Sequence, residues 1–264
     1  MGIRGAQASF KGMVANFDWN MGRLLSFLDK ESLADDTILI YLTDNGTSAG
    51  AVFGKGTRIY GWPVDPAENA NMRGGKSSAY DGGHRVPLFI RWPNGNLGTP
   101  RDIDALTAHL DITPTLMDLC QLARPNDWPK LDGRSLAPLL METDQDWSSR
   151  TLHTQMHGGN GFRKPGDLWE IGTAMTQRWR VVEGKELYDI KADPAQRADL
   201  ADEHPDVVAD LTQEHEQWHA SGKSGMDPTR ILIGSDDENP TDLTSQDWVM
   251  PAGSPPWAHS HVVR

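Results

Sequence analysis

The spacing of apolar residues predicts one long helix near the start of the chain, over residues 10–30. Six apolar side chains recur there at steps of mostly three and four residues, which places them on one face of a helix. They are Met13, Phe17, Met21, Leu24, Leu25 and Leu28. The unbroken β-rich run from Thr37 to Leu42 comes next and predicts a strand buried on both faces.

A second strand is expected over residues 85–92, where Pro93-Asn94-Gly95 closes another apolar run. We expect it to pair with residues 37–42. The glycine-rich stretch from Gly46 to Gly75 is too polar to form core. A helix begins near Asp111, because an acidic residue and a proline in the first turn precede apolar residues at helical spacing.

Beyond Asp146 the pattern changes to shorter elements. Residues 178–182 and 186–190 resemble strands, and residues 205–219 show the spacing of an amphipathic helix. The remaining tail holds five of the 17 prolines and few periodic apolar positions. Three parts are predicted: 1–149 as part of an α/β domain, 150–224 as a small antiparallel α+β unit, and 225–264 as a connector or the start of a truncated module.

Composition excludes several classes of protein. With 38% hydrophobic and 23% charged residues, the 264-residue chain is neither disordered nor collagen-like. It contains no apolar run of about 18 residues, so no membrane span is expected, and no export signal is visible at its start. The net charge is −12, and no basic stripe offers a surface for nucleic acid. The single cysteine, Cys120, cannot form an internal disulfide.

Candidate chemistry begins at the carboxyl end of the first predicted strand, where open α/β sheets bind ligands. Asp44 and Asn45 carry the oxygen donors that Ca²⁺ or Mg²⁺ prefers, and Gly46 permits a bend that would aim both at one point. Asp-Asn-Gly is also common in ordinary turns. These residues alone leave a metal site and a simple turn both open.

The second candidate is Lys76, which follows Gly74-Gly75 and precedes Gly82-Gly83. Glycines let a backbone approach a ligand closely, and a lysine ammonium is a point charge suited to an anion. A solvated lysine on a flexible loop is the alternative that this spacing leaves open.

Five segments, taken together, resemble the C-terminal half of sulfatases of the alkaline-phosphatase superfamily. They are Thr43 to Gly46, Gly75 to Pro87, His109 to Leu119, Asp132 to Leu140 and Glu186 to Ala201. The match covers residues 10–220 and departs from the usual pattern at Asp81, where Glu is commoner. The resemblance implies an α/β fold, a partial sulfatase-like sandwich, with a small C-terminal α+β domain made of an antiparallel sheet plus a helix.

The resemblance also implies a function, the hydrolysis of sulfate esters in the manner of arylsulfatases. Asp44 and Asn45 match a pair that ligates Ca²⁺, and Lys76 matches a lysine that contacts the sulfate and the leaving-group oxygen. His84 is a second candidate for contact with the substrate. Structural roles near the site are implied for Gly46, Gly82, Gly83 and Arg85. The implied substrate is a sulfated small molecule or polysaccharide, and the implied location is periplasmic or extracellular.

One departure limits these expectations. Sulfatases generate a formylglycine nucleophile in a C-x-P-S-R or S-x-P-x-R segment, and neither pattern occurs in this chain, where Gln121-Leu122-Ala123 follows Cys120. The further metal ligands, a second lysine and two histidines are also expected from an N-terminal half. We therefore expect half an active site, an incomplete Ca²⁺ ligand set, no activity alone and a need for that N-terminal half as partner. Residues 37–42 and 86–92 should then expose apolar surface.

Two other functions remain open. One is a non-catalytic Ca²⁺-binding remnant, or one half of a split enzyme. The other is a phosphoesterase or phosphonate hydrolase of the same superfamily, which would differ mainly in the nucleophile segment.

A third pattern, H-E-x-x-H at residues 215–219, is the zinc-protease signature. The extended form needs a third histidine where Gly225 stands, and no downstream acid on the helix replaces it. The helical pattern places His215 on the flank of the buried face and His219 at its edge. This indicates an amphipathic helix without metal. His153 is expected at the surface.

Overall fold

The computed structural model describes residues 3–47, 69–142, 147–155, 169 and 171–221, together with four two-residue strands outside these ranges. The helices are α1 (Ile3–Lys30), α2 (Asp81–His84), α3 (Ile112–Leu119), α4 (Ala137–Leu140) and α5 (Pro205–Ala220), with the 3₁₀ turns η2 (Pro93–Gly95) and η3 (His109–Asp111). The strands are β1 (Leu39–Leu42), β2 (Val52–Phe53), β3 (Thr57–Arg58), β4 (Leu88–Arg91), β5 (Leu152–Thr154), β6 (Thr173–Met175), β7 (Trp179–Val182), β8 (Glu186–Asp189), β9 (Leu232–Ile233) and β10 (Leu243–Thr244).

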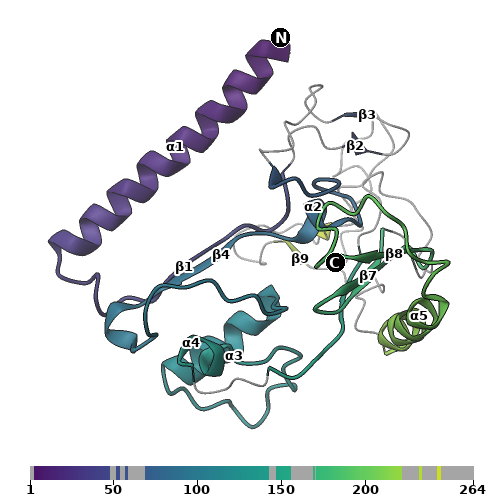
Figure 1. Ribbon diagram of the computed structural model, residues 1–264. Helices are drawn as coiled ribbons and strands as arrows, with labels where there is room; N and C mark the ends of the chain where they lie inside the picture. The colour runs from purple at the N-terminus through teal and green to yellow at the C-terminus, as the bar shows by residue number, and fades with distance from the viewer. Residues whose placement is uncertain are drawn as a thin grey trace, which may run out of the picture.

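The first predicted helix is α1, which starts earlier than its apolar spacing indicated. It ends where Ser32 adopts a φ of 58° and the Leu33 amide bonds the Leu28 carbonyl at 2.8 Å, a bond that caps a helix carboxyl end. Figure 1 shows the helix standing apart from the rest of the described chain. Leu28 near its end is buried, whereas Phe17 and Trp19 on its shaft are exposed. No described helix is long and apolar enough to cross a membrane.

The predicted pairing of residues 37–42 with 85–92 is confirmed, because β1 and β4 form an antiparallel ladder with Ile40 opposite Ile90. Full burial of the first strand is not observed: its residues are half-buried or exposed. Phe89 on β4 is 66% exposed, and Leu42 is exposed as well. The expected exposure of apolar surface is therefore confirmed. The physical reason is that β4 is the one strand paired with β1 among the described residues.

The predicted C-terminal elements are confirmed as β7, β8 and α5. They belong to a four-stranded antiparallel sheet in the order β5-β6-β7-β8. Side chains alternate across this sheet, so Val181 and Leu187 pack against Leu211 of α5. On the opposite face Val182 and Tyr188 pack against Ala79, which lies in the candidate site segment. The sheet thus has a helix on one face and the site segment on the other.

The fold class is confirmed: the chain is mixed α/β and includes an antiparallel sheet with a helix. The helix expected near Asp111 is α3, and Cys120 is the exposed residue directly after it. Most of the 225–264 tail lies outside the described residues, apart from the β9–β10 pair.

Candidate active site

Backbone contact between two glycine segments brings the candidate residues together. The Gly46 amide donates to the Gly83 carbonyl at 3.0 Å, and a Cβ built on Gly46 would lie 1.8 Å from the Gly82 carbonyl oxygen. A Cβ on Gly82 would in turn lie 2.5 Å from the Arg73 carbonyl oxygen. Only residues without side chains permit this approach. The backbone packing therefore leaves no room for a side chain at Gly46 or Gly82. The structural role near a sulfatase site that the resemblance implies for Gly46, Gly82 and Gly83 stays a prediction.

Lys76 is fixed next to the same turn, because its amide donates to the Thr47 carbonyl at 2.8 Å. This bond places the lysine backbone beside the Asp44-Asn45 segment. Asp44 is exposed and Asn45 is half-buried. Within the described part of the chain, neither side chain has a hydrogen bond or ion pair, and the Lys76 ammonium has none. Two oxygen-bearing side chains and one cation are thus available to a ligand.

Asp81, the first residue of α2, fixes this segment to the C-terminal sheet. Its carboxylate is fully buried and accepts a 2.9 Å hydrogen bond from Nε of Arg180, a buried residue of β7. Its amide donates to Oε1 of Gln196 at 2.8 Å. Thr173 of β6 donates to the Ala79 carbonyl. Burial lowers the Arg180 pKa while the nearby carboxylate raises it, and burial prevails.

A second cluster lies beside this ion pair, around Arg73. The Arg73 guanidinium donates to the hydroxyls of Tyr188 at 2.7 Å and Tyr80 at 2.8 Å, and it lies 3.8 Å over the Tyr80 ring. Both hydroxyls donate to Oε2 of Glu186. Burial and this carboxylate raise the Tyr80 pKa to about 12 and raise that of Tyr188 further. Both tyrosines therefore stay protonated at neutral pH and act as hydrogen-bond donors.

The remaining candidates are His84, whose ring bonds the protein backbone, and the exposed Arg85. The His84 ring donates from Nε2 to the Ala79 carbonyl at 3.2 Å, and burial lowers its pKa. Arg85 is half exposed and lies 3.7 Å from the Asp81 carboxylate. The positive charge of Arg85 thus helps to compensate the buried negative charge of Asp81. The role of His84 as a substrate contact remains a prediction.

The H-E-x-x-H helix was misjudged in one respect. His215 is fully buried in α5 rather than on its flank, with Trp169 stacked on its ring at 3.9 Å. Its Nδ1 lies 3.2 Å from Nδ1 of His153, which is half-buried in β5 and not at the surface. The reason is that the two imidazole rings pack with Trp169 and Trp218 as an aromatic cluster. No group of three or more metal-binding side chains occurs among the described residues.

Sequence reasoning missed Arg180 and Gln196, which hold the candidate segment in place. Arg180 lies in a strand whose apolar neighbours gave no sign of a buried ion pair. Gln196 falls inside the Glu186 to Ala201 segment already singled out, yet its partner stands 115 residues earlier. Pairings at such separations leave no periodic signal in a single sequence.

Comparison with known families settles the membership of the chain. The sulfatase family model matches residues 6–122, and the model described as N-sulphoglucosamine sulphohydrolase, C-terminal, matches residues 75–221. The second match alone spans more than half of the chain. The chain belongs to the sulfatase family.

Similar sulfatases come from bacteria and animals. The chain is 29% identical over 217 residues to N-acetylgalactosamine-6-O-sulfatase of Bacteroides thetaiotaomicron, a match covering 76% of this chain and 40% of that protein. It is 37% identical over 127 residues to human steryl-sulfatase, covering 48% of this chain and 20% of that protein. The chain thus spans less than half the length of the relatives it matches.

Solved structures agree on the fold. One sulfatase from the glycosaminoglycan metabolism of Bacteroides thetaiotaomicron has a TM-score of 0.58 at 26% identity, with 77% of this chain and 43% of that chain covered. The phosphonate monoester hydrolase of Agrobacterium radiobacter has a TM-score of 0.56 at 23% identity, with 86% and 44% covered. The second likeness shows a shared fold alone.

Proposed function

We propose that this chain supplies the Asp44, Asn45 and Lys76 side of a sulfatase active site that hydrolyses sulfate esters. The observation that carries the proposal is the joining of the two loops at Gly46, Gly82 and the Lys76–Thr47 hydrogen bond. It brings the backbone of Lys76 beside the segment that carries Asp44 and Asn45. Among the described residues these three side chains have no hydrogen bond or ion pair that would compete with a ligand. Membership of the sulfatase family supports the same reaction.

Lys76 has the clearest chemical role in this proposal. Its ammonium would donate a hydrogen bond to the ester oxygen and so stabilise the negative charge that gathers there as the sulfur–oxygen bond breaks. Its backbone is fixed at both ends of a short loop, because its amide bonds Thr47 and the Ser78 amide bonds Gly75 at 3.0 Å. A preorganised cation needs little rearrangement during the reaction.

Asp44 and Asn45 would hold a calcium ion, since carboxylate and amide oxygens are ligands that Ca²⁺ accepts. Neither side chain is committed to another described residue, so both fit this role. The ion, when bound, neutralises charge on the sulfate oxygens. Two protein ligands are fewer than the six to eight oxygens that Ca²⁺ takes, so the remaining ligands and the nucleophile would come from an N-terminal half.

For the substrate, we propose a sulfated sugar rather than a small aryl sulfate. Support comes from relatives described as sugar sulfatases, among them N-acetylgalactosamine-6-O-sulfatase and N-acetylglucosamine-6-O-sulfatase. Each matches about three quarters of this chain, whereas the steryl-sulfatase match covers 48%.

A chimera tests the proposal. Residues 3–221 of this chain would replace the matching segment of the Bacteroides N-acetylgalactosamine-6-O-sulfatase, which supplies the rest of the site. Hydrolysis of 4-methylumbelliferyl sulfate and of N-acetylgalactosamine 6-sulfate would then be measured. We expect activity, and a loss of about 100-fold with Lys76→Ala, the size found when one charge-stabilising donor is removed. Arg124→Ala, an exposed change outside the site, is the control.

A folded chimera without sulfatase activity would refute the proposal and favour a non-catalytic remnant. Faster hydrolysis of a phosphonate monoester than of the sulfate ester would instead favour the phosphonate hydrolase alternative. Equal activity of the Lys76→Ala chimera and the parent chimera would show that Lys76 has no role in the reaction.

A further inference from the structure

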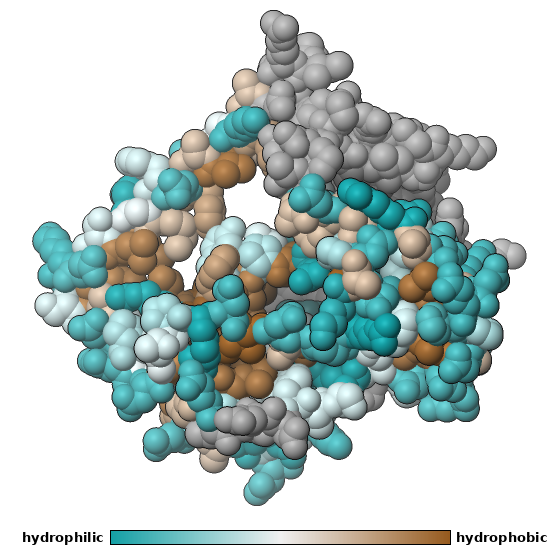
Figure 2. Space-filling model, in the orientation of Figure 1, coloured by the Kyte–Doolittle hydropathy of each residue, from teal (hydrophilic) through white to brown (hydrophobic). Residues whose placement is uncertain are grey.

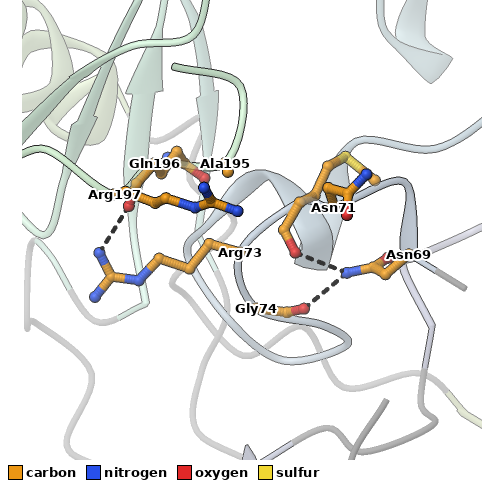
Figure 3. A pocket seen from close by; sticks show the side chains of 8 residues that line it. Asn69, Asn71, Arg73, Gly74, Ala195, Gln196 and Arg197 are labelled. Carbon is orange, nitrogen blue, oxygen red and sulfur yellow. Dashed lines mark hydrogen bonds between the residues drawn. The ribbon is translucent and has the colours of Figure 1, made fainter. Parts of the chain in front are cut away.

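A pocket of about 570 Å³ lies beside the candidate site, between the 69–74 segment and the 195–197 turn that follows β8. Its volume is within the roughly 300–1,000 Å³ of small-molecule sites. Figure 3 shows its polar lining, with Asn69 and Asn71 on one side, Gln196 and Arg197 on the other, and the Arg73 side chain reaching across to the Gln196 carbonyl. No acidic residue lines it among the described residues.

The two arginines of the pocket differ in their partners. The Arg73 guanidinium is occupied, because it bonds both tyrosine hydroxyls and the Gln196 carbonyl at 3.2 Å. The Arg197 guanidinium has no hydrogen bond or ion pair with any residue that the structure describes. The Asp193 carboxylate accepts the amides of Arg197 and Ala198. The Arg197 charge contributes to lowering the Asp193 pKa, but the two side chains form no ion pair. Arg197 therefore presents an available cation.

The amide side chains of the pocket walls are turned into the protein. Nε2 of Gln196 is buried without a hydrogen-bond partner in the described structure, while its Oε1 is taken by the Asp81 amide. On the opposite wall, Nδ2 of Asn69 already donates to the carbonyls of Met72 and Gly74. The Arg197 guanidinium, in a lining without an acidic residue, therefore favours a negatively charged ligand.

Gly82 links the pocket wall to the Asp44-Asn45-Gly46 segment. A Cβ on Gly82 would lie 2.6 Å from the Gly74 carbonyl oxygen in the pocket wall, and a Cβ on Gly46 would meet Gly82 from the other side. Lys76 follows Gly74 by two residues. The pocket wall therefore continues along the backbone into the loop that carries Lys76.

We propose that Arg197 and this pocket form a subsite for a second anionic group, a sulfate or a carboxylate, on a sugar residue neighbouring the one whose ester meets Lys76. This inference rests on the proposed function. Guanidinium groups bind such planar or tetrahedral oxyanions through paired hydrogen bonds. The subsite makes charged polysaccharides, rather than neutral chains with one sulfate, the substrate class.

Isothermal titration of the 264-residue chain with three sugars tests the inference. They are N-acetylgalactosamine 6-sulfate, a tetrasaccharide alternating uronic acid with N-acetylgalactosamine 6-sulfate, and the same tetrasaccharide without sulfate. We expect Arg197→Gln to weaken binding of the sulfated tetrasaccharide by about tenfold, the effect of one charge-assisted contact. Binding of the monosaccharide should not change. Arg124→Gln makes the same charge change on another exposed arginine and should bind like wild type.

Equal affinity of Arg197→Gln and wild type for the sulfated tetrasaccharide would overturn the inference, as would no binding to wild type at millimolar concentration. If Arg197→Gln also weakens binding of the desulfated tetrasaccharide, the group bound by Arg197 is the carboxylate. If it weakens binding of the sulfated tetrasaccharide only, the group is the sulfate. If the monosaccharide binds in a Lys76-dependent manner but Arg197→Gln changes no affinity, the Arg197 subsite is refuted and the proposed sulfatase function stands. If Arg197→Gln weakens binding of the tetrasaccharide but the monosaccharide does not bind at all, the result counts against the proposed sulfatase site and supports the pocket as an anion-binding site.

Discussion

At the scale of single residues, the candidate site depends on the absence of side chains as much as on their presence. The Asp-Asn-Gly and Gly-Gly segments could be singled out from the sequence, because glycine and hard oxygen donors have recognisable chemistry. The sequence did not indicate that Gly46 touches Gly82. It also left Asp81 as a conservative departure, whereas the structure gives it a buried ion pair with Arg180.

Replacement of Gly46 by alanine should destabilise the chain by about 1–3 kcal/mol, the usual penalty for overpacking. The added methyl group would overlap the Gly82 carbonyl oxygen, a backbone atom that cannot rotate away. Gly12→Ala in α1 is the matched control, since nothing lies within 4 Å of its Cβ and alanine is the better helix former. Urea unfolding midpoints measure both, and a Gly46→Ala protein as stable as wild type would contradict the described contact.

Removal of Arg180 from the Arg180–Asp81 pair should cost up to about 3–5 kcal/mol, because the buried Asp81 carboxylate keeps only the half-exposed Arg85 as a cationic partner, 3.7 Å away. Arg180→Met is the test variant, and Arg178→Met is the comparison, since Arg178 pairs with Asp189 from a half-exposed position. The double variant Arg180→Met with Asp81→Asn should recover part of the loss. Additive losses in the unfolding free energy would show that the two side chains do not interact.

At the scale of elements, apolar periodicity predicted α1, β1, β4, β7, β8 and α5 well, since each has a clear apolar pattern. It failed where polar aromatic residues replace aliphatic ones in a core. His215 lies at the centre of the buried face of α5, between Trp169 and His153. From the sequence alone, a core histidine cannot be told apart from a surface histidine or a metal-binding histidine.

The histidine pair should make the docking of α5 sensitive to acid. Burial and the neighbouring His215 lower the His153 pKa from 6.5 to about 4. The folded state therefore binds fewer protons than the unfolded state between these values, so stability falls as the pH drops from 6.5 towards 4. The melting temperature of wild type should decline over this window more steeply than that of His153→Gln. Parallel declines would show that the pair does not titrate as described.

At the scale of the whole molecule, apolar surface is exposed on α1 and on the β1–β4 ladder. Figure 2 shows brown side chains along the helix and on the body beside it. The exposed residues include Met13, Val14, Phe17, Trp19 and Phe89. Patches of this kind mark interfaces or aggregation-prone faces. The sequence predicted the exposure of the strands, but the exposure of the helix depends on what packs beside it, which periodicity cannot state.

The purified chain should therefore self-associate and bind the dye ANS. The double variant Phe17→Lys with Phe89→Lys should reduce both effects without loss of helical circular dichroism, because both side chains are at least half exposed. Sedimentation velocity over a range of concentrations measures the association. A wild-type chain that stays monomeric and does not increase ANS fluorescence would contradict the exposed apolar surface.

The bonds that hold the site segment also order its assembly in time. Asp81 is joined to Arg180 across 99 residues and to Gln196 across 115, so the turn that carries Lys76 lacks its support until the C-terminal sheet has formed. Pairing over such separations is slow, because the entropy cost of closing a long loop comes before the stabilising contact forms. On the ribosome, α1 and β1 emerge well before these partners. Maturation of the Lys76 turn is therefore a late event in biosynthesis, set by the folding of the last third of the chain.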